Sequence, residues 1–102
     1  MLNQEIQPDN YIKEKAHFTI TLLMTLCKLK QNENVDDVYF NPNIDKIEIY
    51  VFTYKEDFST EDFIIQTIVE WEKEQKYFPE IYINQSDEGK INILPRGAMK
   101  IC

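Results

Sequence analysis

The clearest pattern in the chain is an alternation of aliphatic and aromatic side chains in residues 46–54. Because a β-strand sends alternate side chains to opposite faces, Ile47, Ile49 and Val51 share one face of this predicted strand. The other face carries one acidic and three aromatic residues: Glu48, Tyr50, Phe52 and Tyr54. A sheet with one solvated face alternates apolar with polar residues. The pattern therefore predicts a strand whose second face is also covered, at least part of the time.

Two longer stretches have the periodicity of helices. Residues 10–30 carry apolar side chains on a broad arc, and Asp9 is the predicted N-cap. Residues 60–76 form the second predicted helix, which begins at a sequence resembling a capping box, Ser59 to Asp62, and is stopped by Pro79. The apolar arc of the first helix is wider than the stripe of an ordinary surface helix. We therefore expect it to contact more than the sheet, either the second helix or another subunit.

Three further stretches alternate as strands do: residues 37–41, 80–85 and 91–94. The turn residues Asn41, Pro42 and Asn43 predict an antiparallel hairpin between the first two strands. Residues 86–89 predict a second hairpin loop before the last strand. The expected fold is a two-layer α+β sandwich of order α-β-β-α-β-β, with two helices on one face of a mostly antiparallel four-stranded sheet.

The length of 102 residues predicts one domain, 1–102, because such a chain builds a single core. Within it, residues 1–8 read as a loose N-terminal arm and residues 96–102 as a short C-terminal tail. The N-terminus lacks the basic start and apolar stretch of a signal peptide, and no apolar run reaches the length of a membrane span. These features predict a cytoplasmic protein with no membrane contact.

Placing the aliphatic positions of the strands toward the helices leaves four of the six tyrosines on the opposite face. With the phenylalanine at the centre, the predicted contact residues of this face are Tyr39, Tyr50, Phe52, Tyr54 and Tyr82. Tyrosine offers a large rigid surface with one polar tip and is enriched at protein interfaces. Cross-strand tyrosines also stabilise exposed sheets, so a purely structural role is the alternative interpretation.

Charge decides against nucleic acid as the ligand of this face. Residues 33–88 carry 15 acidic residues and four lysines, and Arg96 is the only arginine of the chain. Base-stacking platforms are bordered by lysine and arginine, since phosphate contacts dominate their affinity. A protein surface, most simply a second copy of the chain, fits the aromatic pattern without requiring such basic residues.

The residue types needed for common catalytic sites are scarce. With two glycines in the chain, neither a P-loop nor a dinucleotide-binding motif can be written, and no cofactor is predicted. His17 is the only histidine and is expected on a solvated helix surface, while Ser59 and Ser86 are assigned to a cap and a turn. No metal site is predicted, because the carboxylate pairs lack the histidines or the calcium-loop spacing of known sites. Cys27 is expected to be a small buried hydrophobe and Cys102 an exposed thiol.

These observations favour a small non-catalytic protein-binding or regulatory module, self-associating as a homodimer through the aromatic sheet face or the broad apolar helix. The alternative is an acidic inhibitor or immunity-type protein that blocks a basic, nucleic-acid-binding site, as the net charge of −7 would allow. An enzyme that uses a carboxylate pair is a third possibility and would need a pocket of converging acids.

Overall fold

The computed structural model describes residues 8–42, 46–75, 78–88 and 93–101. Its two helices are α1 (Pro8–Leu29) and α2 (Phe58–Glu72). The four strands are β1 (Val35–Pro42), β2 (Ile47–Thr53), β3 (Glu80–Gln85) and β4 (Met99–Ile101), and a short 3-10 helix, η1 (Ser86–Glu88), follows β3. The order is the predicted α-β-β-α-β-β of an α+β fold.

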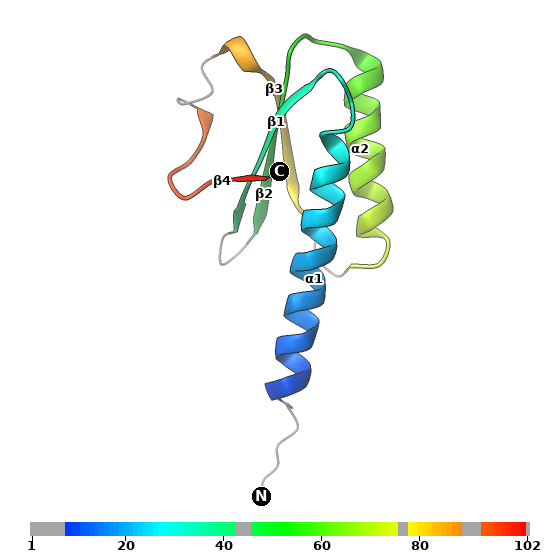
Figure 1. Ribbon diagram of the computed structural model, residues 1–102, viewed down its shortest axis with the longest axis vertical. Helices are drawn as coiled ribbons and strands as arrows, with labels where there is room; N and C mark the ends of the chain where they lie inside the picture. Colours follow the sequence, from blue (N-terminus) through cyan, green and yellow to red (C-terminus); the bar gives the residue numbers. More distant parts are fainter. Residues whose placement is uncertain (1–7, 43–45, 76–77, 89–92, 102) are drawn as a thin grey trace, which may run out of the picture.

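The strands form one sheet in the order β3-β2-β1-β4, and both helices lie on the same side of it (Figure 1). β1 is antiparallel to both β2 and β4, whereas β2 and β3 are parallel. A parallel pair needs a crossover connection, and α2 supplies it. The N-terminal half of α1 continues past the end of the sheet and past α2 (Figure 1).

The core lies between the helices and the aliphatic face of the sheet, as the alternation predicts. On α1, Leu22, Leu26 and Leu29 are spaced at helical intervals and are buried. The remaining core residues with at most 1% exposure are Val38, Ile49, Val51, Ile64 and Ile68. The two helices also meet through Trp71, whose indole Nε1 donates a hydrogen bond of 3.1 Å to Thr21 Oγ1. The broad arc of α1 therefore contacts α2 as well as the sheet.

The N-cap of α2 differs from the predicted one. Asp57 has extended backbone angles, and its carboxylate accepts hydrogen bonds from the backbone N–H and the hydroxyl of Thr60, at 3.1 and 2.7 Å. The helix thus begins at Phe58 and not near Thr60. Ser59 was the predicted cap, but a carboxylate two residues earlier takes that role because it accepts both donors of Thr60.

The last strand was also placed wrongly. β4 lies at residues 99–101, within the stretch expected to be a tail, and the described part of residues 91–94 contains no strand. β3 and β4 do not form the predicted hairpin, because they occupy opposite edges of the sheet. β4 pairs instead with β1, and its Ile101 is 9% exposed and belongs to the core. One buried residue at the end of the chain was too weak a signal to predict a strand.

Cys27 is disulfide-bonded, contrary to the expectation of a reduced buried side chain. The only other cysteine of the chain, Cys102, lies outside the described residues, as do the predicted loose arm up to residue 7 and the turn residue Asn43. In the described part of the chain, no helix is both long and apolar enough to cross a membrane.

Candidate functional site

The sheet face that points away from the helices carries most of the predicted contact residues, and we call it the tyrosine face (Tyr39, Tyr50, Phe52 and Tyr82). The strand register places Tyr50 beside Tyr39 on one side and beside Tyr82 on the other. The rings of Tyr50 and Tyr82 are stacked, with centroids 4.9 Å apart and an angle of 15° between their planes. The ring of Tyr39 meets Phe52 edge-on, at 5.9 Å and 90°. Both geometries are favourable for aromatic pairs.

Exposure differs sharply among the five predicted contact residues. Phe52 has no exposed surface and Tyr50 is 7% exposed, whereas Tyr82 is 36% and Tyr54 61% exposed. Tyr54 lies just beyond the end of β2. The central residues are thus core residues of the second face, and Tyr82 and Tyr54 are the ones most available to a partner.

The connection between β3 and β4 is the part of the chain that crosses this face. Its described residues, 86–88 and 93–98, lie on the side of the sheet opposite the helices, between the edge strands β3 and β4 (Figure 1). At its start, Ser86 Oγ donates a hydrogen bond of 2.7 Å to Asp36 in β1, two strands away from β3. Near its end, the backbone of Gly97 comes so close to Asn41 that an added Cβ would lie 3.7 Å from Oδ1. The cover expected for the second face is therefore supplied by the chain itself.

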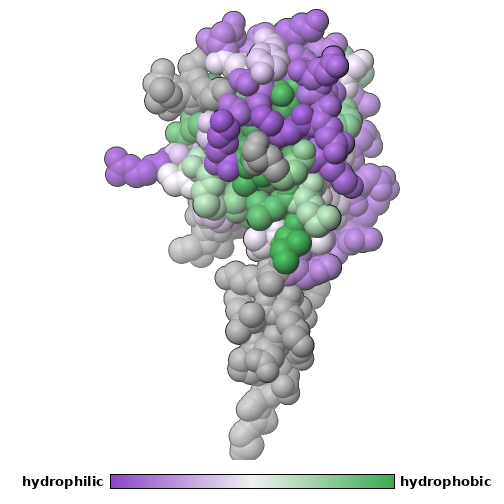
Figure 2. All heavy atoms as spheres, viewed as in Figure 1, coloured by the Kyte–Doolittle hydropathy of each residue, from purple (hydrophilic) through white to green (hydrophobic). Residues whose placement is uncertain are grey.

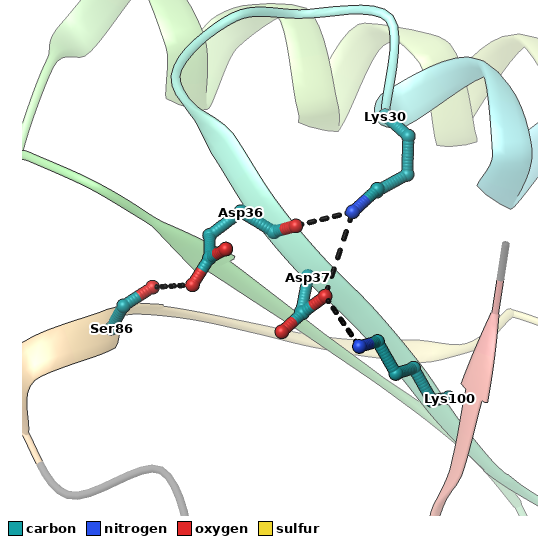
Figure 3. Close-up of polar contacts among 5 residues, drawn as sticks. All are labelled: Lys30, Asp36, Asp37, Ser86 and Lys100. Atoms are coloured by element: carbon teal, nitrogen blue, oxygen red, sulfur yellow. Dashed lines mark hydrogen bonds and ion pairs between the residues drawn. The ribbon is translucent and has the colours of Figure 1, made fainter.

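One polar cluster fastens this crossing segment and β4 to the start of β1 (Figure 3). Asp37 forms ion pairs with Lys30, after α1, at 3.5 Å and with Lys100, in β4, at 3.3 Å. Lys30 Nζ also donates a hydrogen bond to the backbone carbonyl of Asp36. The side chain of Asp37 is only 14% exposed, so both lysines neutralise a carboxylate that is largely withdrawn from water. The cluster explains how a strand of three residues stays attached to the sheet.

A second polar cluster borders the opposite end of the tyrosine face. Lys46 lies 3.6 Å from Glu48 and 3.1 Å from Glu80, and the hydroxyl of Tyr82 donates a hydrogen bond of 2.6 Å to Glu80. That hydrogen bond, together with the one to Lys46, lowers the pKa of Glu80. The same bond to Glu80 raises the pKa of Tyr82, and burial followed by the charge of Glu48 raises the pKa of Tyr50. The acidic groups here are already neutralised or hydrogen-bonded within the fold.

The hydroxyl of Ser86 donates to a carboxylate of the fold, and no nearby imidazole activates it in the way that a nucleophilic serine requires. His17 lies exposed on α1, as expected. Among the described residues, no group of three or more histidine, cysteine, aspartate or glutamate side chains is placed to hold a metal ion.

The outer side of α1 is a second candidate surface, and we call it the α1 stripe (Ile20 and Met24). These residues are 56% and 62% exposed, one turn apart on the helix. Figure 2 shows apolar residues gathered over the C-terminal half of α1. The width of the apolar arc in the sequence signalled this surface, but not which of its residues would be left outside the core.

Three comparisons with known proteins give no further information about the site. No protein-family model matches the chain. Neither a curated protein nor a solved structure matches it.

Proposed function

We propose that this protein is a non-catalytic binding module that works as a homodimer and contacts a partner protein through the α1 stripe. The observation that carries the proposal is the exposure of Ile20 and Met24, at 56% and 62%, on a helix whose opposite side is already in the core. Single exposed apolar residues are normal on protein surfaces. Two of them stacked one turn apart form a continuous apolar ridge, which is the form in which a helix binds a groove.

Helical geometry separates this ridge from the buried side of α1. With about 100° of rotation per residue, Ile20 and Met24 lie roughly half a turn around the helix from Leu22 and Leu26. Their exposed surface lies outside the packed core. A helix of a two-layer sandwich normally presents polar residues on that side. The apolar ridge therefore favours a partner with a groove or helix of matching hydrophobic character.

The burial of the tyrosine face shifts the proposal toward the helix. Phe52 and Tyr50 were predicted to contact a partner, yet 0% and 7% of their surface is accessible in the folded chain. A partner could reach these two side chains only after a rearrangement of the folded chain. Tyr82 and Tyr54 remain accessible and stay predicted contact residues.

Site-specific photocrosslinking tests the proposal. A benzoylphenylalanine at position 24 is expected to form an adduct with one discrete protein in extracts of the native cells, and Ile20→Glu is expected to abolish that adduct. The matched control carries the crosslinker at position 70 on α2, where the side chain of Glu70 is 69% exposed. Adducts of equal yield and diversity at both positions would show that the α1 stripe binds nothing in particular.

The acidic inhibitor remains a second proposal, supported by α2. The helix carries Glu61, Asp62, Glu70 and Glu72 and no basic residue between Phe58 and Glu72. This surface suits a basic partner such as the nucleic-acid site of an enzyme. Binding to a basic protein should weaken steeply as salt is added, because salt screens exposed charges. The paired variant Glu61→Gln with Asp62→Asn should remove most of that salt dependence.

A further inference from the structure

β3 lies at one end of the described sheet. β3 is the first strand of the sheet order and pairs only with β2, so no described strand lies on its other side. Its register with β2 is continuous over Glu80 to Gln85, without a bulge. The stretch from Ile81 to Gln85 contains no charge, proline or glycine. An edge of this kind is a template for pairing with another strand.

The opposite edge of the sheet is built differently. β4 has three residues, one of which is Lys100, and β1 beside it has an irregular register between Val35 and Asp37. Short length, lysine and bulges are the devices by which proteins keep an edge from pairing. β3 has none of them along its last five residues. The contrast within one sheet indicates that the β3 edge is left open for a partner strand.

We propose that β3 pairs antiparallel with β3 of a second copy of this chain, across a two-fold axis that passes next to Tyr82. The two sheets then join into one of eight strands, with all four helices on the same face. This inference rests on the homodimer of the proposed function and not on the α1 stripe.

The sequence of β3 is complementary to itself in this arrangement. With Tyr82 opposite its own counterpart, Ile81 lies opposite Ile83 of the second copy, and Glu80 lies opposite Asn84. No like charges meet, and each carboxylate faces an amide while it keeps its ion pair with Lys46. In this register, even-numbered residues lie opposite even-numbered ones and odd opposite odd. The isoleucines of the two copies therefore meet on the helix face and the tyrosines on the tyrosine face.

Tyr82 supplies the most specific contact. Its ring already stacks on Tyr50 at 4.9 Å, and its hydroxyl is held by Glu80 at 2.6 Å, so its orientation is fixed before any dimer forms. Directly opposite residues in antiparallel strands have Cβ atoms about 4.5–5.5 Å apart, within reach of an aromatic pair. The dimer would extend the row of tyrosines across the axis and cover the 36% of Tyr82 that is exposed.

Sedimentation equilibrium of Tyr82→Lys, with Tyr54→Lys as its matched control, tests the inference. Both substitutions place a lysine at an exposed tyrosine on the same side of the sheet, but only position 82 sets two like charges face to face across the axis. We expect wild type and Tyr54→Lys to dimerise alike, and the dissociation constant of Tyr82→Lys to rise by about tenfold or more. Far-UV circular dichroism of each variant checks that the fold is retained.

The outcomes separate this inference from the proposed function. A dimer that Tyr82→Lys leaves intact and Met24→Glu dissociates would overturn pairing through β3 while the homodimer stands. A wild type that sediments as a monomer at every concentration would overturn the homodimer and the β3 inference together, and the crosslinking result at position 24 would be unaffected.

A disulfide introduced at the axis tests the register itself. Antiparallel partners have Cα atoms about 4.5–5.5 Å apart, which a disulfide spans. Mild oxidation of Tyr82→Cys is expected to give a covalent dimer whose position 82 cross-link is identified by peptide mapping, whereas Tyr54→Cys gives none. A wild-type dimer without any cross-link at position 82 would overturn the register around Tyr82.

Discussion

The two faces of β2 are both buried, but different parts of the chain bury them. On the helix face, Ile49 and Val51 have no exposed surface and lie under α1 and α2. On the tyrosine face, Phe52 is equally buried, beneath Tyr39 and on the side of the sheet that the connection to β4 crosses. The first cover is made of two helices, whereas the printed contacts on the second face are between aromatic rings.

This difference has a consequence for stability. The helix face is held by aliphatic packing between elements of 22 and 15 residues. The tyrosine face depends on a strand of three residues and on the ion pairs of Asp37. Regions with few buried contacts open more readily than the global unfolding transition. We therefore expect the tyrosine face to be the first part of the core that water reaches, although its central residue is as buried as any other.

The most severe test of this comparison removes one large side chain from each face. Phe52→Ala should lower the free energy of unfolding by about 3–5 kcal/mol, and Ile68→Ala on α2 by about 2–5 kcal/mol, because each leaves a cavity in a packed region. Urea denaturation followed by tryptophan fluorescence measures both. Equal losses would show that the tyrosine face is a genuine second core.

The control for this pair is Tyr54→Ala. Tyr54 belongs to the same alternating strand pattern as Phe52 but is 61% exposed, so its loss should change stability by less than about 1 kcal/mol. A loss at Phe52 no larger than that at Tyr54 would mean that the second face is open in solution.

The sequence predicted on which face of the sheet each side chain lies far better than it predicted which part of the chain covers that face. Strict alternation in β2 placed Ile49 and Val51 on one side and Tyr50 and Phe52 on the other, because the period of a strand is two whatever surrounds it. What covers Phe52 depends on the path of the chain from β3 to β4. The alternation at residues 91–94 predicted a strand, and the local sequence carries no signal for where this path runs.

The same reasoning explains the two misplaced elements. Ser59 was predicted as the N-cap of α2 from the capping-box pattern. Asp57, two residues earlier, is the N-cap in the structure and accepts the hydrogen bonds of Thr60. The predicted last strand rested on the alternating isoleucines at positions 91 and 93, which are as compatible with a crossing loop as with a strand. β4 is fixed by long-range pairing with β1, a contact that local sequence does not encode.

The next test compares the ion pairs of Asp37, beside the tyrosine face, with the exposed ion pair of Glu70 on α2. Asp37→Ala removes the shared partner of Lys30 and Lys100 and should lower the free energy of unfolding by about 1–2 kcal/mol, between the values for exposed and fully buried pairs. The comparison variant is Glu70→Ala, whose partner Lys73 is equally exposed at the surface of α2. Its loss should be within about 0.5 kcal/mol of zero.

Hydrogen exchange localises the effect of Asp37→Ala. Amides of β4 should exchange faster in the variant, while those of α2 keep their wild-type protection. Uniformly faster exchange throughout the chain would mean that the two faces unfold as one unit, and the proposed difference between them would be lost.

A smaller effect on the helix layer comes from the cap of α2. Asp57→Ala should lower the melting temperature by a few degrees, whereas Ser59→Ala at the position favoured by the sequence should leave it unchanged. The hydrogen bonds from the hydroxyl and backbone N–H of Thr60 lower the pKa of Asp57. A lowered pKa in the folded state means that the contribution is present above the unfolded value of 3.8 and is lost as the pH falls through the folded value. In thermal melts between neutral and acidic pH, Asp57→Ala should therefore melt below wild type at neutral pH and converge with it in acid, whereas Ser59→Ala should match wild type throughout.

The smallest signal, and the most specific to the tyrosine face, is its titration with base. Burial raises the pKa of Tyr50 above 10.0, and the hydrogen bond to Glu80 raises that of Tyr82. The absorbance of tyrosinate at about 295 nm should therefore show that two tyrosines ionise at higher pH in the folded chain than in urea. Since a raised pKa stabilises the folded state below the unfolded value, this contribution is lost as the pH rises through the folded values.

Glu80→Gln distinguishes the two causes. It removes the carboxylate that holds the proton on Tyr82 and leaves the burial of Tyr50 in place, so one late ring should shift to lower pH while the other stays late. If both rings shift together, Tyr50 is governed by the charge at the open edge and not by its cover. The tyrosine face would then be a solvated surface that resembles a core only in its packing. The two faces of β2 would share the alternating sequence pattern and not the exclusion of water.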